Sequence, residues 1–357
     1  MATEPPKITD APIDHLLFNQ ATKIFGRMCL DAQKGQIISM VGPTQAGKSL
    51  VFEHIVRSLL STFSHCAEQL VPLVYVQVES VEEGRVKAKW LDLMMLKKLR
   101  HPVYMHVGDL DELDYYVPSK ARDETSLRVA MGSALTARET ICVALDEAHL
   151  LTRTKIADLR AHILESLKSM AAINRTLLLC GGYELAYKGL FDHPHFAGRT
   201  ITYDFGRYTQ TTEHMTEWKR ILACFSQYLR LEPNSLLLDM ADALLLAANG
   251  TIGLLEKWLW ACKKYADATS KAITIDVLQA FAPPLSEQKI IADDISKGQQ
   301  ALSNVPKVKK QSQEDEASKK EANVTPHTSK TSKTKRRPFE SLPRRIEIKG
   351  IEIYQCD

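Results

Sequence analysis

The stretch Gly42-Pro43-Thr44-Gln45-Ala46-Gly47-Lys48-Ser49 decides how the rest of this chain is interpreted. It matches the pattern G-x-x-x-x-G-K-[ST], whose glycines let a loop curl its backbone N–H groups around phosphates. The apolar run 37–41 predicts a buried strand before the loop, and residues 50–60 predict a helix after it. The N-terminal end of that helix would face the same phosphates. A chance glycine-rich turn is the alternative, and the flanking strand and helix argue against it. We therefore expect a site for a nucleoside triphosphate.

The chemistry of the loop assigns roles to two side chains. Lys48 is expected to reach the β- and γ-phosphate oxygens, and the Ser49 hydroxyl is expected to hold Mg²⁺. The expected cofactors are therefore ATP and Mg²⁺. The residues expected to bind them are Gly42, Pro43, Thr44, Gln45, Ala46, Gly47, Lys48, Ser49, Leu50 and Asp146.

Two acidic residues follow the apolar strand expected over 140–145. Asp146 is placed to order the Mg²⁺ shell together with Ser49, and Glu147 is placed to polarise a water near the γ-phosphate. Two surface acids after a strand are the alternative. His149 completes the string D-E-A-H of one helicase group, but a short helical set follows here instead of a second similar domain. We expect His149 to be a packing or hydrogen-bonding residue at the start of a helix.

One arginine is a candidate for catalysis in trans. Arg199 comes just before the strand expected over 200–205, where it could reach the γ-phosphate bound by a neighbouring subunit. A surface arginine capping that strand is the alternative, and Arg207 is a weaker candidate for the same role.

Composition is compatible with several classes of protein and excludes others. The 357 residues are 45% hydrophobic and 25% charged, which suits a globular chain of about two domains. The net charge of +3 is too small to indicate nucleic-acid binding by itself. The seven cysteines form no C-x-x-C pair, which favours a reducing cytoplasm over a disulfide framework. The first residues do not resemble a signal peptide, and no window approaches the ~20 apolar residues of a membrane span.

The order of apolar runs predicts the fold class. Continuous apolar strands separated by helices are typical of a parallel sheet covered on both faces, so we expect an α/β fold with five parallel strands. Ligands of such sheets bind beyond the carboxyl ends of the strands. The strands are expected over 37–41, 73–78, 140–145, 176–180 and 200–205, with a helix over 155–171.

The later part of the chain changes character. We expect an α/β nucleotide-binding domain over 1–210 and a small all-helical lid over 211–284, with helices over 211–229, 235–248, 252–266 and 274–281. Residues 285–337 have the composition of a disordered linker, and 338–357 read as a short partner-docking tail whose segment 344–353 alternates like a strand. The tail's basic residues suit DNA contact, docking on a partner protein or plain solubility equally well; they are Lys333, Lys335, Arg336, Arg337, Arg344 and Arg345.

This order of elements resembles the AAA+ ATPases, over roughly residues 10–285. Within them the chain resembles the transposition regulators of the TnsC/TniB/MuB group, most of all the short TnsC proteins of CRISPR-associated transposons. The residues that carry the resemblance are 42–49, 142–149, 177–182 and 250–255, followed by Trp258-Leu259-Trp260-Ala261. The resemblance implies a bacterial, cytoplasmic, DNA-associated ATPase that forms a ring or filament on double-stranded DNA. Its implied partners are transposase subunits and a target-selection protein. No association with a membrane is implied.

The chain departs from the AAA+ pattern at both sensor positions. Cys180-Gly181-Gly182 offers no polar sensor at the end of the fourth strand, and Tyr183 is a poor substitute. Gly253 stands near the position of the lid arginine, and Lys257 comes one turn later. Both departures predict slow intrinsic hydrolysis that suits a switch more than a motor.

Contacts to DNA are expected between the second strand and Asp146, where basic residues could track phosphates without reading bases. We favour Lys120 and Arg122, which follow Pro118 in an expected loop. Lys97, Lys98 and Arg100 are also candidates. The alternative is that these three form the solvated face of an amphipathic helix whose core side is Trp90, Leu91, Met94 and Met95.

Three other functions compete with a scaffold for transposition. An AAA+ helicase loader or remodelling ATPase is the main alternative, although the basic tail suits recruitment of a partner better. A small-molecule kinase would need neither the Asp146-Glu147 pair nor a lid of this size. An ABC-type ATPase is excluded because the chain has no L-S-G-G-Q-like stretch.

Overall fold

A computed structural model describes residues 15–80, 86–153, 157–171, 174–188, 196, 198–303, 344–348 and 351–355. The chain divides into two units, residues 1–307 and 308–357. Among the described helices, none is long and apolar enough to cross a bilayer.

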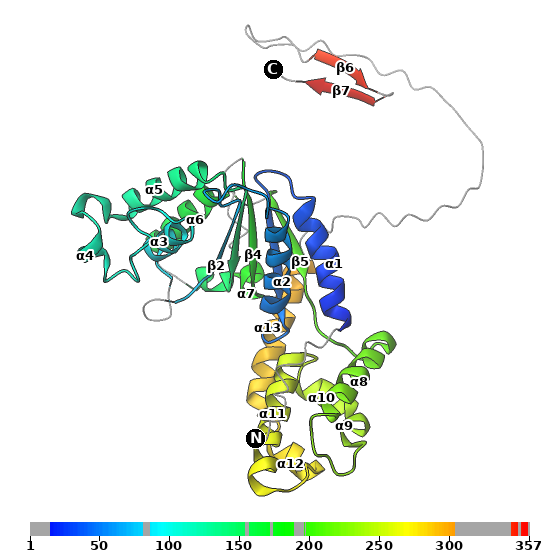
Figure 1. Ribbon diagram of the computed structural model, residues 1–357. Coiled ribbons are helices and arrows are strands. Elements are labelled where there is room, and N and C mark those ends of the chain that lie inside the picture. The colour runs from blue at the N-terminus through cyan, green and yellow to red at the C-terminus, as the bar shows by residue number, and fades with distance from the viewer. Residues whose placement is uncertain are drawn as a thin grey trace, which may run out of the picture. The chain divides into compact units, whose positions relative to one another are not determined.

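The first unit is built around a five-stranded sheet (Figure 1). Its strands are β1 (Ile37–Gly42), β2 (Leu73–Gln77), β3 (Cys142–Asp146), β4 (Thr176–Gly182) and β5 (Thr200–Asp204). They are all parallel and lie in the order β2-β3-β4-β1-β5, with β1 between β4 and β5. The α/β arrangement expected for an AAA+ domain, with all five predicted strands, is therefore confirmed.

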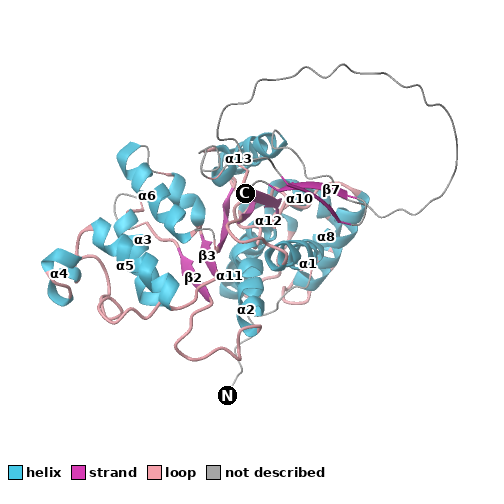
Figure 2. Cartoon of the chain, turned by 90° about the horizontal axis from the view of Figure 1, so that it is seen from above, coloured by secondary structure: helices cyan, strands magenta, loops and turns pink. Residues whose placement is uncertain are grey.

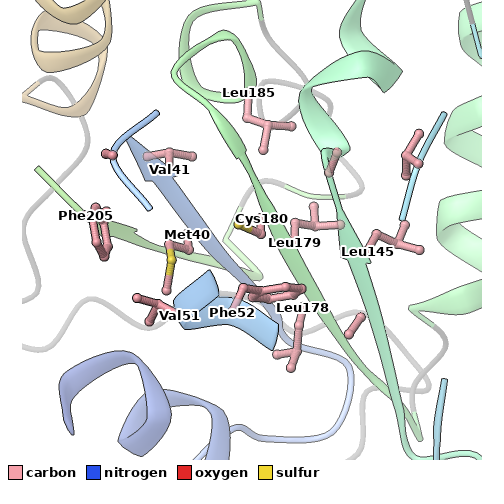
Figure 3. Close-up of a cluster of buried hydrophobic side chains, with 14 of the residues drawn as sticks. Met40, Val41, Val51, Phe52, Leu145, Leu178, Leu179, Cys180, Leu185 and Phe205 are labelled. Atoms are coloured by element: carbon pink, nitrogen blue, oxygen red, sulfur yellow. The ribbon is translucent and has the colours of Figure 1, made fainter. Parts of the chain in front are cut away.

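The core lies where the helix after β1 packs on the sheet. Helix α2 (Lys48–Ser61) buries Val51 and Phe52 against the central strands, and α1 (Leu16–Leu30) packs on α2 and β1. Figure 3 shows Phe52 beside Leu178 of β4, with Met40 of β1 close by. Apolar side chains therefore pack against β1, and all residues of this strand are buried. Burial on both faces explains why this strand reads as a continuous apolar run.

Helices α3 (Ala88–Lys98), α5 (Glu124–Ala137) and α6 (Ala157–Met170) pack on one another beside β2 (Figure 1). The α3–α5 connection contains α4 (Leu113–Tyr116) and the 3₁₀ turn η2 (Ser119–Ala121). In α3, Trp90, Leu91 and Met95 are buried, Met94 is half-buried and Lys98 is exposed. A helix is therefore present here, but it is buried on most sides, Lys97 is half-buried and Arg100 lies beyond its end.

The helical insert, formed by α3, α5 and α6 between β2 and β4, contains a buried carboxyl group. Asp92 of α3 is fully buried, and its Oδ2 accepts a hydrogen bond from Ser166 Oγ at 3.1 Å and lies 3.8 Å from Arg128 Nε. Its Oδ1 has no hydrogen-bond partner in the described part of the chain. Burial raises the pKa of Asp92 from 3.8 to about 7, against the opposing effects of Ser166 and Arg128. Glu124, which pairs with Arg128 and His162, adds to the rise.

Asp92→Asn is expected to remove a loss of stability that the wild-type chain undergoes as the pH rises from about 4 through 7. The pKa is higher in the folded protein than in the unfolded chain, so the folded form binds the proton more tightly, and wild-type stability falls as the pH rises from about 4 through 7. Three pKa units correspond to on the order of 4 kcal/mol, which is an upper value for the gain of the variant at pH 8. Melting temperatures at pH 5 and pH 8 measure it, with exposed Asp293→Asn as the control. Equal gains at both pH values would contradict this account.

The predicted all-helical region follows β5 and is confirmed, with different boundaries. Its helices are α8 (Thr212–Ser226), α9 (Leu236–Asp239), α10 (Ala241–Ala247), α11 (Ile252–Thr269) and α12 (Ile275–Ala280). The single helix expected over 235–248 is interrupted at Met240, whose φ of −99° and ψ of 14° leave the helical range although its N–H still bonds the Leu236 carbonyl. Trp218 and Trp258 anchor the lid core, and their Nε1 groups donate to the carbonyls of Ala241 and Leu278.

One boundary was wrong. Residues 285–303, expected to begin a disordered linker, form the helix α13 (Leu285–Ser303). The polar composition of this segment hides a narrow apolar stripe, because Ile291 and Ile295 are one turn apart and both buried. Pro283 and Pro284, interpreted as the end of the helical set, instead precede a new helix. A proline is compatible with the entry of a helix, where its missing N–H costs nothing.

The second unit contains a β-hairpin. β6 (Arg344–Ile348) pairs antiparallel with β7 (Ile351–Gln355), so that Ile346 lies opposite Ile353. The single strand expected over 344–353 is thus two strands, because the alternation continues on both sides of Lys349-Gly350. The expected linker residues 304–337 lie outside the described residues.

Candidate nucleotide-binding site

The loop that carries the motif connects β1 to α2 at the carboxyl edge of the sheet. Gly42 ends β1 opposite Gly182 of β4, and Gly47 has a φ of 94°, which favours glycine, directly before α2 starts at Lys48. The predicted strand–loop–helix context is therefore confirmed. Figure 2, which is seen from above, shows α3, α5 and α6 grouped together on the β2 side of the sheet.

Lys48 is held inside the loop. Its side chain is buried, and its Nζ donates to the Pro43 carbonyl at 2.5 Å. Burial lowers the pKa of Lys48, and the carboxylates of Glu147 and Asp146 act in the opposite direction. An ammonium group in so little water interacts strongly with any anion that enters the loop.

The two acids after β3 reach the loop from different depths. Asp146 is buried behind the pocket, where its Oδ2 accepts a hydrogen bond from the Tyr75 hydroxyl at 3.4 Å. Glu147 has a φ of 52°, and its N–H donates to Asp146 Oδ1 at 2.7 Å. This left-handed backbone is costly for a residue with a side chain. It brings Glu147 Oε1 within 3.5 Å of the Ser49 hydroxyl.

Lys48, Ser49 and Glu147 line one pocket of about 420 Å³. Ser49, Asp146 and Glu147 are oxygen donors of the kind that Mg²⁺ prefers, so this side of the pocket fits the expected metal. The pocket is lined by Thr44, Gln45, Gly47, Lys48, Ser49, Leu50, Glu147, His149, Arg153, Gly182, Glu184 and Asp294. Of the expected binding residues, Gly42, Pro43, Ala46 and Asp146 lie behind this lining and shape the loop.

Five of the lining residues were not predicted as site residues; one of them is Gly182, at the end of β4. His149 and Arg153 belong to or follow the 3₁₀ helix η3 (Ala148–Thr152), Glu184 begins α7 (Glu184–Tyr187), and Asp294 lies on α13. His149 Nδ1 lies 3.1 Å from Glu147 Oε2, and Arg153 Nε lies 3.5 Å from Glu184 Oε2. His149 and Arg153 are four residues apart, a spacing that places two side chains on one side of a helical turn, so their proximity could have been predicted from the sequence. The segment of Asp294 was expected to have no structure, so nothing pointed to it.

The lid touches the loop directly. The N–H of Gly253, near the start of α11, donates to the Gln45 carbonyl at 2.9 Å. A Cβ at position 253 would lie 2.5 Å from that carbonyl oxygen, so only glycine allows this approach. Lys257, considered for the missing lid arginine, is exposed and does not line the pocket. Tyr183 points elsewhere, because its hydroxyl donates to Asp204 Oδ1 at 2.8 Å.

Arg199 lies at the other edge of the sheet. It directly precedes β5, and its carbonyl accepts the N–H of Ile37 at the beginning of β1, whereas the loop follows the end of β1. Its side chain is exposed. Arg207 follows β5 and donates to the Asn249 carbonyl at 3.4 Å. A role for Arg199 in hydrolysis therefore requires the loop of another copy.

The basic candidates for DNA binding lie in the helical insert, between β2 and β3, and their side chains differ in exposure. Lys98, Arg100 and Lys120 are exposed. Lys97 is half-buried and donates to the Gly108 carbonyl at 3.0 Å, and Arg122 donates to the Val117 carbonyl. The expected loop after Pro118 is the turn η2. His15 is the first described residue, and its Nδ1 lies 2.9 Å from the Tyr208 hydroxyl.

No family model and no curated protein matches this chain. Several solved structures are similar to it. The ORC2 protein of Aeropyrum pernix with ADPNP and ADP is 13% identical, with 78% of this chain and 69% of that chain covered and a TM-score of 0.45. Drosophila ORC bound to DNA is 13% identical, with 74% and 58% covered and a TM-score of 0.46. A Walker-type ATPase of Pyrococcus abyssi is 10% identical, with 81% and 79% covered and a TM-score of 0.43.

Proposed function

We propose that this protein is an AAA+ ATPase that assembles on double-stranded DNA in its ATP-bound form. The observation that carries the proposal is the convergence of Lys48, Ser49 and Glu147 on one pocket at the carboxyl edge of the sheet. In this proposal Lys48 binds the phosphates, and Ser49 with Asp146 would hold Mg²⁺, which neutralises charge on the phosphates. Glu147 orients the attacking water and accepts its proton.

The finer part of the proposal concerns DNA and partners. Exposed Lys98, Arg100 and Lys120 supply the sequence-independent phosphate contacts. The resemblance to the TnsC/TniB/MuB regulators supports a role in transposition, in which the assembly links target selection to the transposase. The wide separation of Arg199 from its own loop supports assembly, because a second copy is needed to complete the site.

Arg199→Ala is expected to leave ATP binding intact and to remove the turnover that assembly stimulates. An arginine finger contributes roughly 10³–10⁵ in rate, so the stimulated rate should fall to the level of the dispersed protein. Phosphate release at low and high protein concentration measures the effect, and exposed Arg230→Ala is the matched control. Unchanged stimulation in the Arg199 variant would assign the finger to another residue.

Sedimentation of the protein with duplex DNA in ATP, in ADP and without nucleotide tests the whole proposal. We expect large DNA-bound assemblies in ATP alone, and we expect them to weaken steeply with added salt. Equal assembly with and without nucleotide would contradict the proposed scaffold. The absence of a DNA-bound species in every nucleotide state would contradict it as well. The second result would leave a loader or remodelling ATPase as the better interpretation.

A further inference from the structure

The helix α13 connects the lid to the nucleotide pocket. It begins after the lid helix α12 and packs on α7, the short helix that follows β4 (Figure 1). Ile291 and Ile295 form its buried stripe. The helix therefore belongs to the folded unit, and its last residue, Ser303, is where the described part of this unit ends.

The contact between α13 and α7 depends on two tyrosines. Gly298 of α13 lies so close to the Tyr183 ring that a Cβ at position 298 would be 2.1 Å from Tyr183 Cγ. The buried Tyr183 cannot easily give way, because its hydroxyl donates to Asp204. One turn earlier on α13, Asp294 Oδ1 accepts a hydrogen bond from the Tyr187 hydroxyl at 2.7 Å. This pair of contacts fixes the register of α13 on α7.

The same contacts place a carboxylate against the phosphate pocket. Asp294 lines the pocket together with Lys48 and Arg153. Burial lowers the pKa of Lys48, and the charge of Asp294 is one of those that act in the opposite direction. Glu184, another carboxylate of the lining, is paired with Arg153 and with Lys188 at 3.1 Å. The hydrogen bond to Asp294 comes from a neutral phenol, which leaves its negative charge to act on the pocket. A triphosphate entering the pocket brings several further negative charges into the same space.

We propose that α13 is a nucleotide-sensitive strap, in which a triphosphate repels Asp294 and releases α13 from Tyr183 and Tyr187. The inference rests on the proposed function, since it requires ATP in this pocket. Asp294 lines the same pocket as Glu147, the residue proposed to orient water at the γ-phosphate, so the strap responds to a triphosphate more than to a diphosphate.

The first test is the affinity of the full chain for a non-hydrolysable ATP analogue and for ADP. Asp294→Asn keeps the shape and the acceptor for Tyr187 but removes the charge. We expect this variant to bind the analogue about tenfold more tightly, with a smaller change for ADP. Asp293→Asn removes the same charge from an exposed neighbouring position and should change neither affinity. Unchanged or weaker binding of the analogue by the Asp294 variant would overturn the strap.

The second test is hydrogen–deuterium exchange of the amides of 285–303. In the wild-type chain, exchange should increase when the analogue binds. Gly298→Ala should show the high exchange without nucleotide, because alanine favours the helix itself and disturbs only its contact with Tyr183. The control is Lys297→Ala, on the exposed side of α13. Bound analogue without increased exchange would overturn the strap alone, whereas a wild-type chain that binds no nucleotide would overturn the proposed function as well.

Discussion

Lys48→Ala is expected to abolish ATP-dependent assembly on DNA and to weaken ATP binding by about a hundredfold or more. Hydrogen bonds to charged groups contribute about 1.5–3 kcal/mol each, and every 1.4 kcal/mol is tenfold in affinity. Lys48 is placed to make more than one such bond, because its Nζ is held within the loop at the Pro43 carbonyl. The low polarity around its buried side chain strengthens each of them.

The fold should survive this substitution. Burial lowers the pKa of Lys48, which shows that the folded chain disfavours the charged form of the side chain at this position. Alanine is also a good residue for the first turn of α2. Fluorescence titration with an ATP analogue and sedimentation with duplex DNA measure the two effects. The exposed Lys34→Ala is the control, and a melting temperature close to that of wild type shows that folding is retained. Normal ATP-dependent assembly by the Lys48 variant would refute the role of the loop.

Glu147→Gln is expected to have the opposite effect on assembly. A positioned general base contributes roughly 10²–10⁴ in rate, so hydrolysis should fall by at least a hundredfold while ATP binding is kept. Glutamine has nearly the same shape and retains an oxygen acceptor near Ser49, but it cannot take a proton from water. The ATP-bound assembly on DNA should therefore persist instead of dissociating with time.

The decay of DNA-bound assemblies after ATP is mixed in measures this persistence, and phosphate release measures the rate. Glu139→Gln supplies a control, because Glu139 is an exposed residue that also has a positive φ of 51°. An assembly of the Glu147 variant that falls apart in ATP as fast as wild type would contradict the proposal that hydrolysis resets the scaffold.

The acids at the end of β3 show how far local patterns lead. Asp146 and Glu147 were predicted as a pair directed at the loop, although about a hundred residues separate them from Ser49. The prediction was possible because parallel strands bring their carboxyl ends to one edge of the sheet. The left-handed backbone of Glu147, which brings its carboxylate within 3.5 Å of Ser49, was not predictable from composition. In this conformation the N–H of Glu147 donates a hydrogen bond to Asp146 Oδ1.

The lid and α13 show where local patterns stop. The helices of 211–284 were predicted because their apolar residues recur at helical spacing, yet the approach of Gly253 to Gln45 was not. A glycine near a helix start has several explanations in a sequence, and only the packed structure shows which one applies. Asp294 was missed altogether, since its helix carries only two strongly buried isoleucines among polar residues. The position of such a helix is determined by its packing on α7.

By itself, the sequence determined the nucleotide loop, the parallel strands and the pair of acids, because each of these is encoded by neighbouring residues whose spacing has one physical meaning. The tertiary structure decided which side chains join them at the pocket. Arg153, Glu184 and Asp294 come together from three separate elements, and Arg199 is placed at the opposite edge of the sheet. These arrangements arise from packing between distant segments, whose free energy depends on the whole fold and leaves no periodic signal in any one stretch of chain.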